Sequence, residues 1–134
     1  MEESSSFEYS ATLRIFGAIP DLTGLTREMS LQQSNSYRRG ERRRPGAEPN
    51  QFDMWMFRVP VHQAEPLHVH IDALWAAIRD RKNYLLELKK QGLTVDVFLG
   101  YRSNSNTAGV EVPYQSLQMF QELEVPFGLS IIIT

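Results

Sequence analysis

The chain has 134 residues, close to the modal size of one domain, which is enough to bury a core without a disulfide or a metal. Its formal net charge of −2 argues against general nucleic-acid binding by the whole molecule. The chain has no cysteine, and this absence excludes thiol catalysis, zinc–cysteine sites and a disulfide framework. Residues 1–6 predict a disordered leader and carry no export signal. No apolar stretch is long enough to span a bilayer. We therefore expect a cytoplasmic protein without a membrane segment.

The amino-terminal half predicts three strands and one helix. Residues 7–15 alternate apolar and polar side chains, which predicts a half-buried strand. Apolar residues at helical spacing predict a short helix over 22–29. A polar region follows, with a weak strand at 36–39 and then a loop. Large apolar groups on both faces of 52–59 predict a strand that is covered on both sides.

The carboxy-terminal half predicts a helix pair, a strand, a helix and a last strand. Apolar spacing over 71–88 indicates a helix, and the charged run 79–82 predicts a kink or break in it. Residues 93–101 alternate as a strand does, and a helix is expected to begin at Pro113. Residues 127–134 predict a strand with isoleucines on both faces, so we expect it to be central in the sheet or covered by a partner.

The order β-α-β-β-α(α)-β-α-β predicts an α+β fold, with a mainly antiparallel sheet and helices packed on it. A single domain should then cover residues 7–134. We expect one core that includes Trp55, Leu74, Trp75, Ile78, Leu117 and Phe120.

The pattern also resembles an uncharacterised family of small bacterial single-domain proteins, catalogued only as a domain of unknown function. The residues that carry the resemblance are Leu13-Arg14-Ile15-Phe16-Gly17, Leu25-Thr26, Arg39-Gly40-Glu41, Trp55, His70-Ile71 with Leu74, and Gly109 before Leu117. The chain departs from the family pattern after the first helix, where it has Met29-Ser30 and Gln33-Ser34. The resemblance implies the fold and supplies no activity.

No group of residues predicts catalysis, a cofactor or a metal. His68 and His70, near Glu65 and Asp72, are potential metal ligands, but residues two apart on a helix do not share a face, and we favour a helix start. Asp96 and Glu111 are weighed as paired carboxylates and interpreted as solvent-facing. Nucleophile-elbow and phosphate-loop motifs are absent, so an enzyme is not favoured.

The basic insert at 38–49 is the main candidate for binding. Arg38, Arg39, Arg42, Arg43 and Arg44 place five of the 14 basic residues within seven positions. They could dock on an acidic protein surface, or grip phosphates while Tyr37 stacks on a base. Glycines and prolines favour a mobile, solvated loop. Tyr37, Tyr101 and Tyr114 lie at the ends of elements and could line a groove.

These observations lead to ranked expectations about function. The first is a non-enzymatic protein-interaction module with an unidentified protein partner, of the kind that neutralises toxins as immunity proteins do. The alternatives are a nucleic-acid-binding accessory module that uses the arginine loop, and an enzyme with an unrecognised site. Because the isoleucines of the last strand cannot all face one core, we also favour a homodimer.

Overall fold

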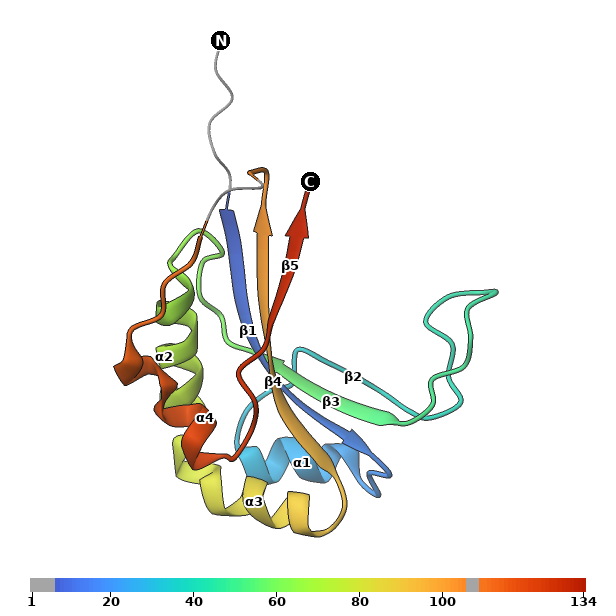
Figure 1. Cartoon of the computed structure of the whole chain (residues 1–134). Helices are drawn as coiled ribbons and strands as arrows, with labels where there is room; N and C mark the ends of the chain where they lie inside the picture. The colour runs from blue at the N-terminus through green and yellow to red at the C-terminus, as the bar shows by residue number, and fades with distance from the viewer. Residues whose placement is uncertain (1–6, 106–108) are drawn as a thin grey trace.

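The computed structural model describes residues 7–105 and 109–134, so the predicted leader 1–6 lies outside the described residues. One curved sheet has all the helices on one side, and its other side carries no helix (Figure 1). Among the described residues, no helix is both long and apolar enough to cross a bilayer.

The sheet has five strands in the order β2-β3-β1-β4-β5. The strands are β1 (Phe7–Gly17), β2 (Asn35–Tyr37), β3 (Asp53–Arg58), β4 (Thr94–Ser103) and β5 (Leu129–Ile133). Every neighbouring pair is antiparallel except β4 and β5, which run parallel. The predicted α+β fold with a mainly antiparallel sheet is therefore confirmed.

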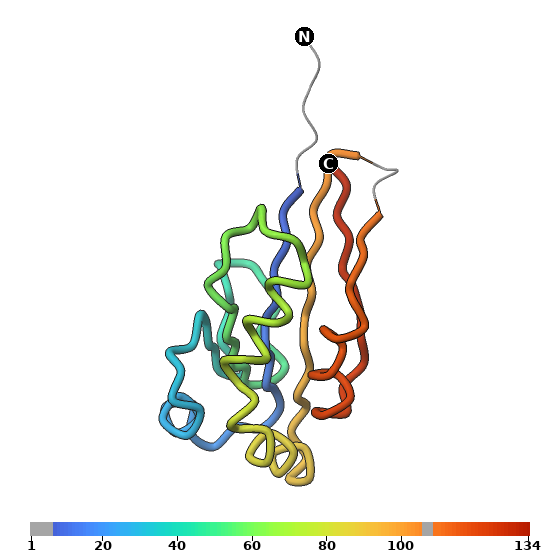
Figure 2. The backbone as a smooth tube through the Cα atoms, turned by 90° about the vertical axis from the view of Figure 1, so that its left-hand side faces the viewer, coloured from blue at the N-terminus to red at the C-terminus, as the bar shows by residue number. Residues whose placement is uncertain are grey.

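The helices form the second layer, which Figure 2 shows in front of the sheet. They are α1 (Leu22–Met29), α2 (Leu67–Ile78), α3 (Lys82–Lys90) and α4 (Gln118–Glu122), with 3-10 turns at η1 (Arg79–Arg81) and η2 (Tyr114–Leu117). The break that the charged run predicts between α2 and α3 is present as η1. This turn changes the direction of the chain between α2 and α3, so that the apolar face of each of the two helices can reach the sheet.

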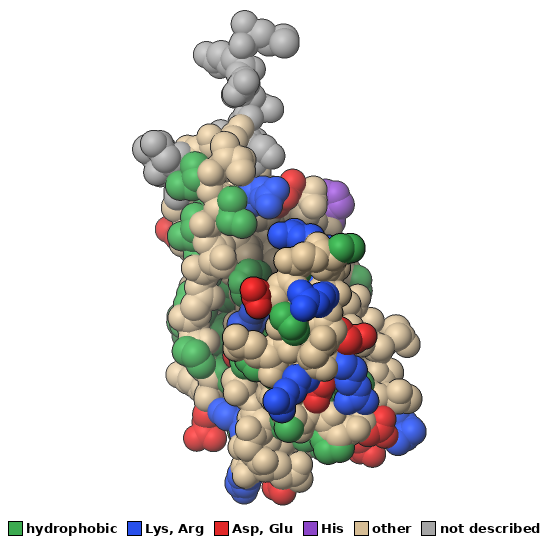
Figure 3. Space-filling model, turned by 90° about the vertical axis from the view of Figure 1, so that its right-hand side faces the viewer, with side chains coloured by type: hydrophobic (Ala, Val, Ile, Leu, Met, Phe, Trp, Pro, Cys, Tyr) green, Lys and Arg blue, Asp and Glu red, His purple; other side chains and the backbone are tan. Residues whose placement is uncertain are grey.

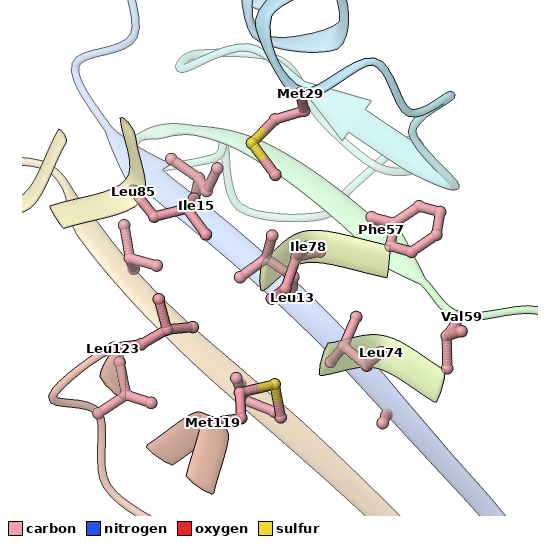
Figure 4. Close-up of a cluster of buried hydrophobic side chains, with 14 of the residues drawn as sticks. Leu13, Ile15, Met29, Phe57, Val59, Leu74, Ile78, Leu85, Met119 and Leu123 are labelled. Atoms are coloured by element: carbon pink, nitrogen blue, oxygen red, sulfur yellow. The ribbon is translucent and has the colours of Figure 1, made fainter. Parts of the chain in front are cut away.

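The core lies between the helices and one face of the sheet (Figure 4). Leu13 and Ile15 of β1 are fully buried there, because period-two alternation turns them toward the helices. Trp55, the opposite residue to Ile15 in β3, is also fully buried. Its indole N–H donates to the Thr26 hydroxyl at 3.0 Å, which gives the buried polar group a partner.

Two residues of the expected core lie at its margin instead. Trp55, Leu74, Ile78 and Phe120 are buried as predicted, whereas Trp75 and Leu117 are only partly buried against the cluster. Helical spacing identifies the apolar stripe of α2, but it does not show which edge of that stripe the tertiary structure covers. Trp75 is on the less covered edge.

Of the two alternatives for the last strand, the central position is wrong, because β5 forms an edge of the sheet, and covering by a partner stays a prediction. Ile131, Ile132 and Ile133 remain 58%, 46% and 54% exposed. The other side of β4 is already occupied by β1, so a chain that returns from the helical layer finds only the outer side of β4 free. Apolar side chains on both faces therefore do not here indicate a central strand.

Candidate binding groove

The face of the sheet without helices is hollowed into a groove with a volume of 690 Å³. Its lining residues come from all the strands except β5 and from the basic loop: Ser10, Thr12, Arg14, Asn35, Ser36, Tyr37, Glu41, Arg42, Arg43, Asn50, Met54, Met56, Arg58 and Phe98. Figure 3 shows this face, on which basic side chains border the hollow. Alternation along each strand explains the lining, since the residues opposite to those of the core must point here.

An ion pair across β1 and β4 borders the groove, and its Arg14 is one of the lining residues. Arg14 faces Asp96 in the register of the two strands, and its Nε and Nη2 atoms donate to the two carboxylate oxygens of Asp96, each at 2.7 Å. This hydrogen bonding raises the pKa of the Arg14 guanidinium. The same guanidinium lies 5.2 Å from the ring centre of Phe98, within cation–π range. Arg14 is thus positioned by the sheet itself.

The basic loop after β2 forms one wall. Arg43 donates to the hydroxyl oxygen of Tyr37 at 2.6 Å and lies 4.9 Å from the centre of its ring. Arg42 donates to the carbonyl oxygen of Ala47 at 2.5 Å, within the loop. Both arginines are held by neutral partners, and no carboxylate of the described residues forms an ion pair with either.

The groove carries excess positive charge. Arg14, Arg42, Arg43 and Arg58 line it, against the acidic lining residue Glu41 and the neighbouring carboxylate of Asp96, which contacts Arg14. Of these arginines, Arg14 forms an ion pair with Asp96, and within the described ranges 7–105 and 109–134 the other three form none. A ligand with negative charge would therefore find guanidinium groups whose charge is still available.

A second hollow of 290 Å³ adjoins the groove on the same face. Ser10, Arg58 and Phe98 line both, so the two hollows meet at these residues. The second hollow adds Arg102 of β4 and Ile132 of β5 at its far side. Together the hollows extend across the open face from the basic loop to β5, which suits an elongated ligand better than a compact one.

Asp53 ties the base of the basic loop to the sheet. Its two carboxylate oxygens accept from the backbone N–H of Arg39 at 2.8 Å and from that of Ile19 at 2.9 Å. These hydrogen bonds, that of Arg39 first, lower the pKa of the Asp53 carboxyl group. Arg38 lies beside them and donates to the carbonyl oxygen of Ile19 at 2.8 Å. The base of the loop is therefore fixed by more contacts than its composition suggests.

The structure separates the six residues that the sequence singles out. Tyr37, Arg42 and Arg43 line the groove together. Arg38 turns back to Ile19 and Asp53 instead, and the contact of Arg39 is made by its backbone. Arg44 is exposed outside the groove lining. Mobility of the loop tip stays a prediction.

Sequence reasoning missed Arg14, Arg58 and Phe98, which complete the groove. Arg14 occupies the polar side of an alternating strand, which is the available signal for its direction. Arg58 ends a strand with large apolar groups on both faces, so alternation gives no such signal for it. That signal does not reveal that β1, β3 and β4 are neighbours, because pairing is set by contacts distant in sequence.

The other candidate groups do not come together. His70 is buried while His68 is partly exposed, and no group of three or more acidic or histidine side chains in the described parts of the chain is arranged to hold a metal. Asp96 contacts Arg14 rather than Glu111. Of the three tyrosines weighed for a groove, Tyr37 lines the groove and Tyr101, although buried beside Tyr9, lines the adjoining second hollow. Tyr114 is 80% exposed on η2 and lines neither hollow.

Comparison with known proteins returns one family. Residues 7–134 match the model of a family described as "Domain of unknown function (DUF4279)". No curated protein matches the chain, and no solved structure does.

Proposed function

The chain belongs to the DUF4279 family, a domain of unknown function, and from that premise we propose that it is a non-enzymatic protein-interaction module. The groove on the open face of the sheet is its binding surface. Its ligand is an extended, acidic segment of a partner protein. The observation that carries the proposal is the set of three groove arginines, Arg42, Arg43 and Arg58, that have no acidic partner in the described chain.

Charge and shape favour such a segment. Guanidinium groups bind carboxylates in a two-pronged geometry, as Arg14 does with Asp96 at the border of the groove. Met54, Met56 and Phe98 supply apolar surface between the charges, which suits a segment that alternates acidic and apolar side chains. The adjoining second hollow lengthens the surface. Positive potential around the groove would also steer an acidic partner toward it.

Nucleic acid is the second candidate and is less favoured. Binding of single strands relies on bases that stack on free aromatic faces. Here a guanidinium already lies over a face of Tyr37, at 4.9 Å, and another over Phe98, at 5.2 Å. The formal net charge of −2 also opposes general attraction of a polyanion.

Neutralisation of a toxin is the narrowest form of the proposal. The basic groove would then cover an acidic surface segment of the toxin. The size of the chain and its exposed basic loop support this form, by analogy with small immunity proteins.

Binding can be tested with a defined probe. A fluorescent peptide of alternating glutamate and leucine is titrated with the full chain at low and high salt, and its anisotropy is measured. A single-stranded oligonucleotide of similar length forms a parallel arm. The test variant carries Arg42→Ala, Arg43→Ala and Arg58→Ala. The control variant carries Arg27→Ala, Arg79→Ala and Lys90→Ala, which removes the same charge from the helical side.

The proposal expects the acidic peptide to bind, less tightly at high salt, and the groove variant to lose at least tenfold in affinity while the control variant does not. Equal loss in both variants would show that net charge alone causes binding. Tighter binding of the oligonucleotide, lost in the groove variant, would favour the nucleic-acid module. Absence of binding in both arms would overturn the groove as an acidic-ligand site.

A further inference from the structure

The outer edge of β5 is unprotected. Edge strands of natural proteins are usually blunted by charged residues, proline or a bulge, which prevent pairing with another chain. The segment 128–134 contains neither a charged residue nor a proline, and within the described residues β5 pairs on one side only, with β4. The opposite edge of the sheet differs, because β2 is only three residues long and leads into the basic loop.

The backbone of β5 presents its free groups in a regular pattern. The N–H of Thr134 donates to the carbonyl oxygen of Ser103 at 3.0 Å, so Thr134 points toward β4. Backbone groups alternate along a strand, and Leu129, Ile131 and Ile133 therefore direct their N–H and C=O groups away from the sheet. Three residues at alternate positions thus offer an edge to a further strand.

From this geometry we infer that β5 pairs with β5 of a second copy of the chain, antiparallel about a two-fold axis at Ile131. In this register Ile131 faces its own counterpart, Leu129 faces Ile133, and Ser130 faces Ile132. The two sheets become one continuous sheet. The proposal does not depend on what the groove binds.

A second copy is the occupant that the side chains and charges favour. The pairing covers Ile131, Ile132 and Ile133, which are 46–58% exposed in the single chain, and each meets an uncharged residue. Arg102 is the nearest open-face cation, on β4 beside Ile132. The two Arg102 residues would be separated by three strand spacings, about 14 Å, well beyond the screening length of about 8 Å at physiological ionic strength. No like charges therefore oppose the pairing.

The two-fold axis would be perpendicular to the sheet, so both open faces lie on the same side of the dimer. The second hollow reaches Ser130 and Ile132 of β5, and the hollows of the two copies would meet near the axis. The dimer would then present two basic grooves on one surface. A five-residue edge is short, so we expect self-association that depends on protein concentration.

Two experiments test the interface. Sedimentation equilibrium over a concentration series measures mass for the wild-type full chain and for Ile131→Lys and Ile131→Pro, with circular dichroism to check folding. The proline variant removes only an outward N–H, which leaves pairing with β4 intact. Tyr114→Lys is the control, since it changes another exposed apolar residue, on η2. We expect dimers for the wild type and the control, and monomers for both Ile131 variants.

Cysteine cross-linking tests the register, because the chain has no cysteine of its own. Across the axis, the two Cα atoms of residue 131 would be about 5.5 Å apart, within the range of about 4.4 to 6.8 Å that a disulfide spans. Those of residue 133 would be about 14 Å apart, at about 3.4 Å per residue. Mild oxidation should cross-link Ile131→Cys at least tenfold faster than Ile133→Cys.

Each contrary outcome overturns a stated part of the inference. A wild-type chain that stays monomeric throughout the series contradicts the dimer. Dimers that survive both Ile131→Lys and Ile131→Pro show that another surface is used. Faster cross-linking of Ile133→Cys shows a different register. All of these results leave the peptide titration of the groove unaffected, so failures of the two proposals can be told apart.

Discussion

Arg14 and Asp96 lie 82 residues apart in the chain and face each other across β1 and β4, joined by two hydrogen bonds of 2.7 Å. Arg14 lines the candidate groove, and the side chains of Arg14 and Asp96 are 32% and 22% exposed. Asp96 thus both orients a groove arginine and cancels its charge.

Asp96→Asn should therefore separate these two effects. Loss of a partly exposed ion pair should cost less than about 1 kcal/mol in the free energy of unfolding, measured by urea denaturation. The acidic peptide should bind more tightly, because the positive charge of Arg14 is no longer compensated. Weaker peptide binding by a folded variant would contradict a ligand-binding role for Arg14. Asp80→Asn, on the helical side, is the charge-matched control.

Trp55 and Trp75 should differ in their contribution to stability. Trp55 is fully buried opposite Ile15, so Trp55→Ala should cost about 3–5 kcal/mol through the cavity that it leaves. Trp75 is only partly buried at the core margin, and Trp75→Ala should cost less, though more than the roughly 0.5 kcal/mol of a surface substitution. Urea denaturation followed by circular dichroism measures both. An equal or larger cost at Trp75 would contradict the placement of α2.

Asp53→Ala should loosen the base of the basic loop. Hydrogen exchange should become faster at the backbone amides of Arg39 and Ile19, which lose their acceptors, whereas Glu48→Ala in the exposed loop should leave both rates unchanged. Unchanged exchange in the Asp53 variant would mean that the loop is held by other contacts.

The pH dependence of that anchor has a definite sign. Hydrogen bonds lower the pKa of Asp53 in the folded chain, so the unfolded chain binds its proton more readily. The stabilisation is complete above the unfolded pKa of about 3.9 and is lost as the pH falls through the folded value. Asp53→Ala should therefore reduce the loss of stability in acid, relative to the wild type.

His70 should make the protein less stable in mild acid. The side chain is 1% exposed, its Nε2 lies 3.1 Å from the carbonyl oxygen of Glu65, and its Nδ1 has no hydrogen-bond partner in the described chain. Burial is the main cause that lowers its pKa, the hydrogen bond to the backbone of Glu65 is the largest opposing effect, and the charge of Arg58 adds a smaller lowering. Protonation would place an unpaired N–H in the core.

The unfolded chain therefore takes up this proton more readily, and the free energy of unfolding should fall as the pH decreases below about 6.5. Denaturation midpoints at a series of pH values measure the slope. His70→Gln should flatten this slope, whereas His68→Gln, at a partly exposed position, should keep it. An unchanged slope in His70→Gln would show that another group is responsible.

Much of the fold could be predicted because periodicity is local. Alternation over residues 7–15 and 93–101 identifies β1 and β4, and the charged run after Ile78 identifies the break at η1. The candidate site was predicted only in part. Arginines of the insert were found from composition, but Arg14 and Arg58 were not, because each is a single charge on an ordinary strand.

The amino-acid sequence by itself therefore determined which segments form strands and helices, and which side of the alternating strands β1 and β4 is apolar, since both follow from the spacing of neighbouring side chains. Only the tertiary structure decided that β5 is an edge, that Trp75 is marginal, and that arginines from two strands and one loop share a groove. The physical reason is that strand order and register depend on the summed contacts of residues far apart in the chain, as for Arg14 and Asp96, and no local pattern encodes them.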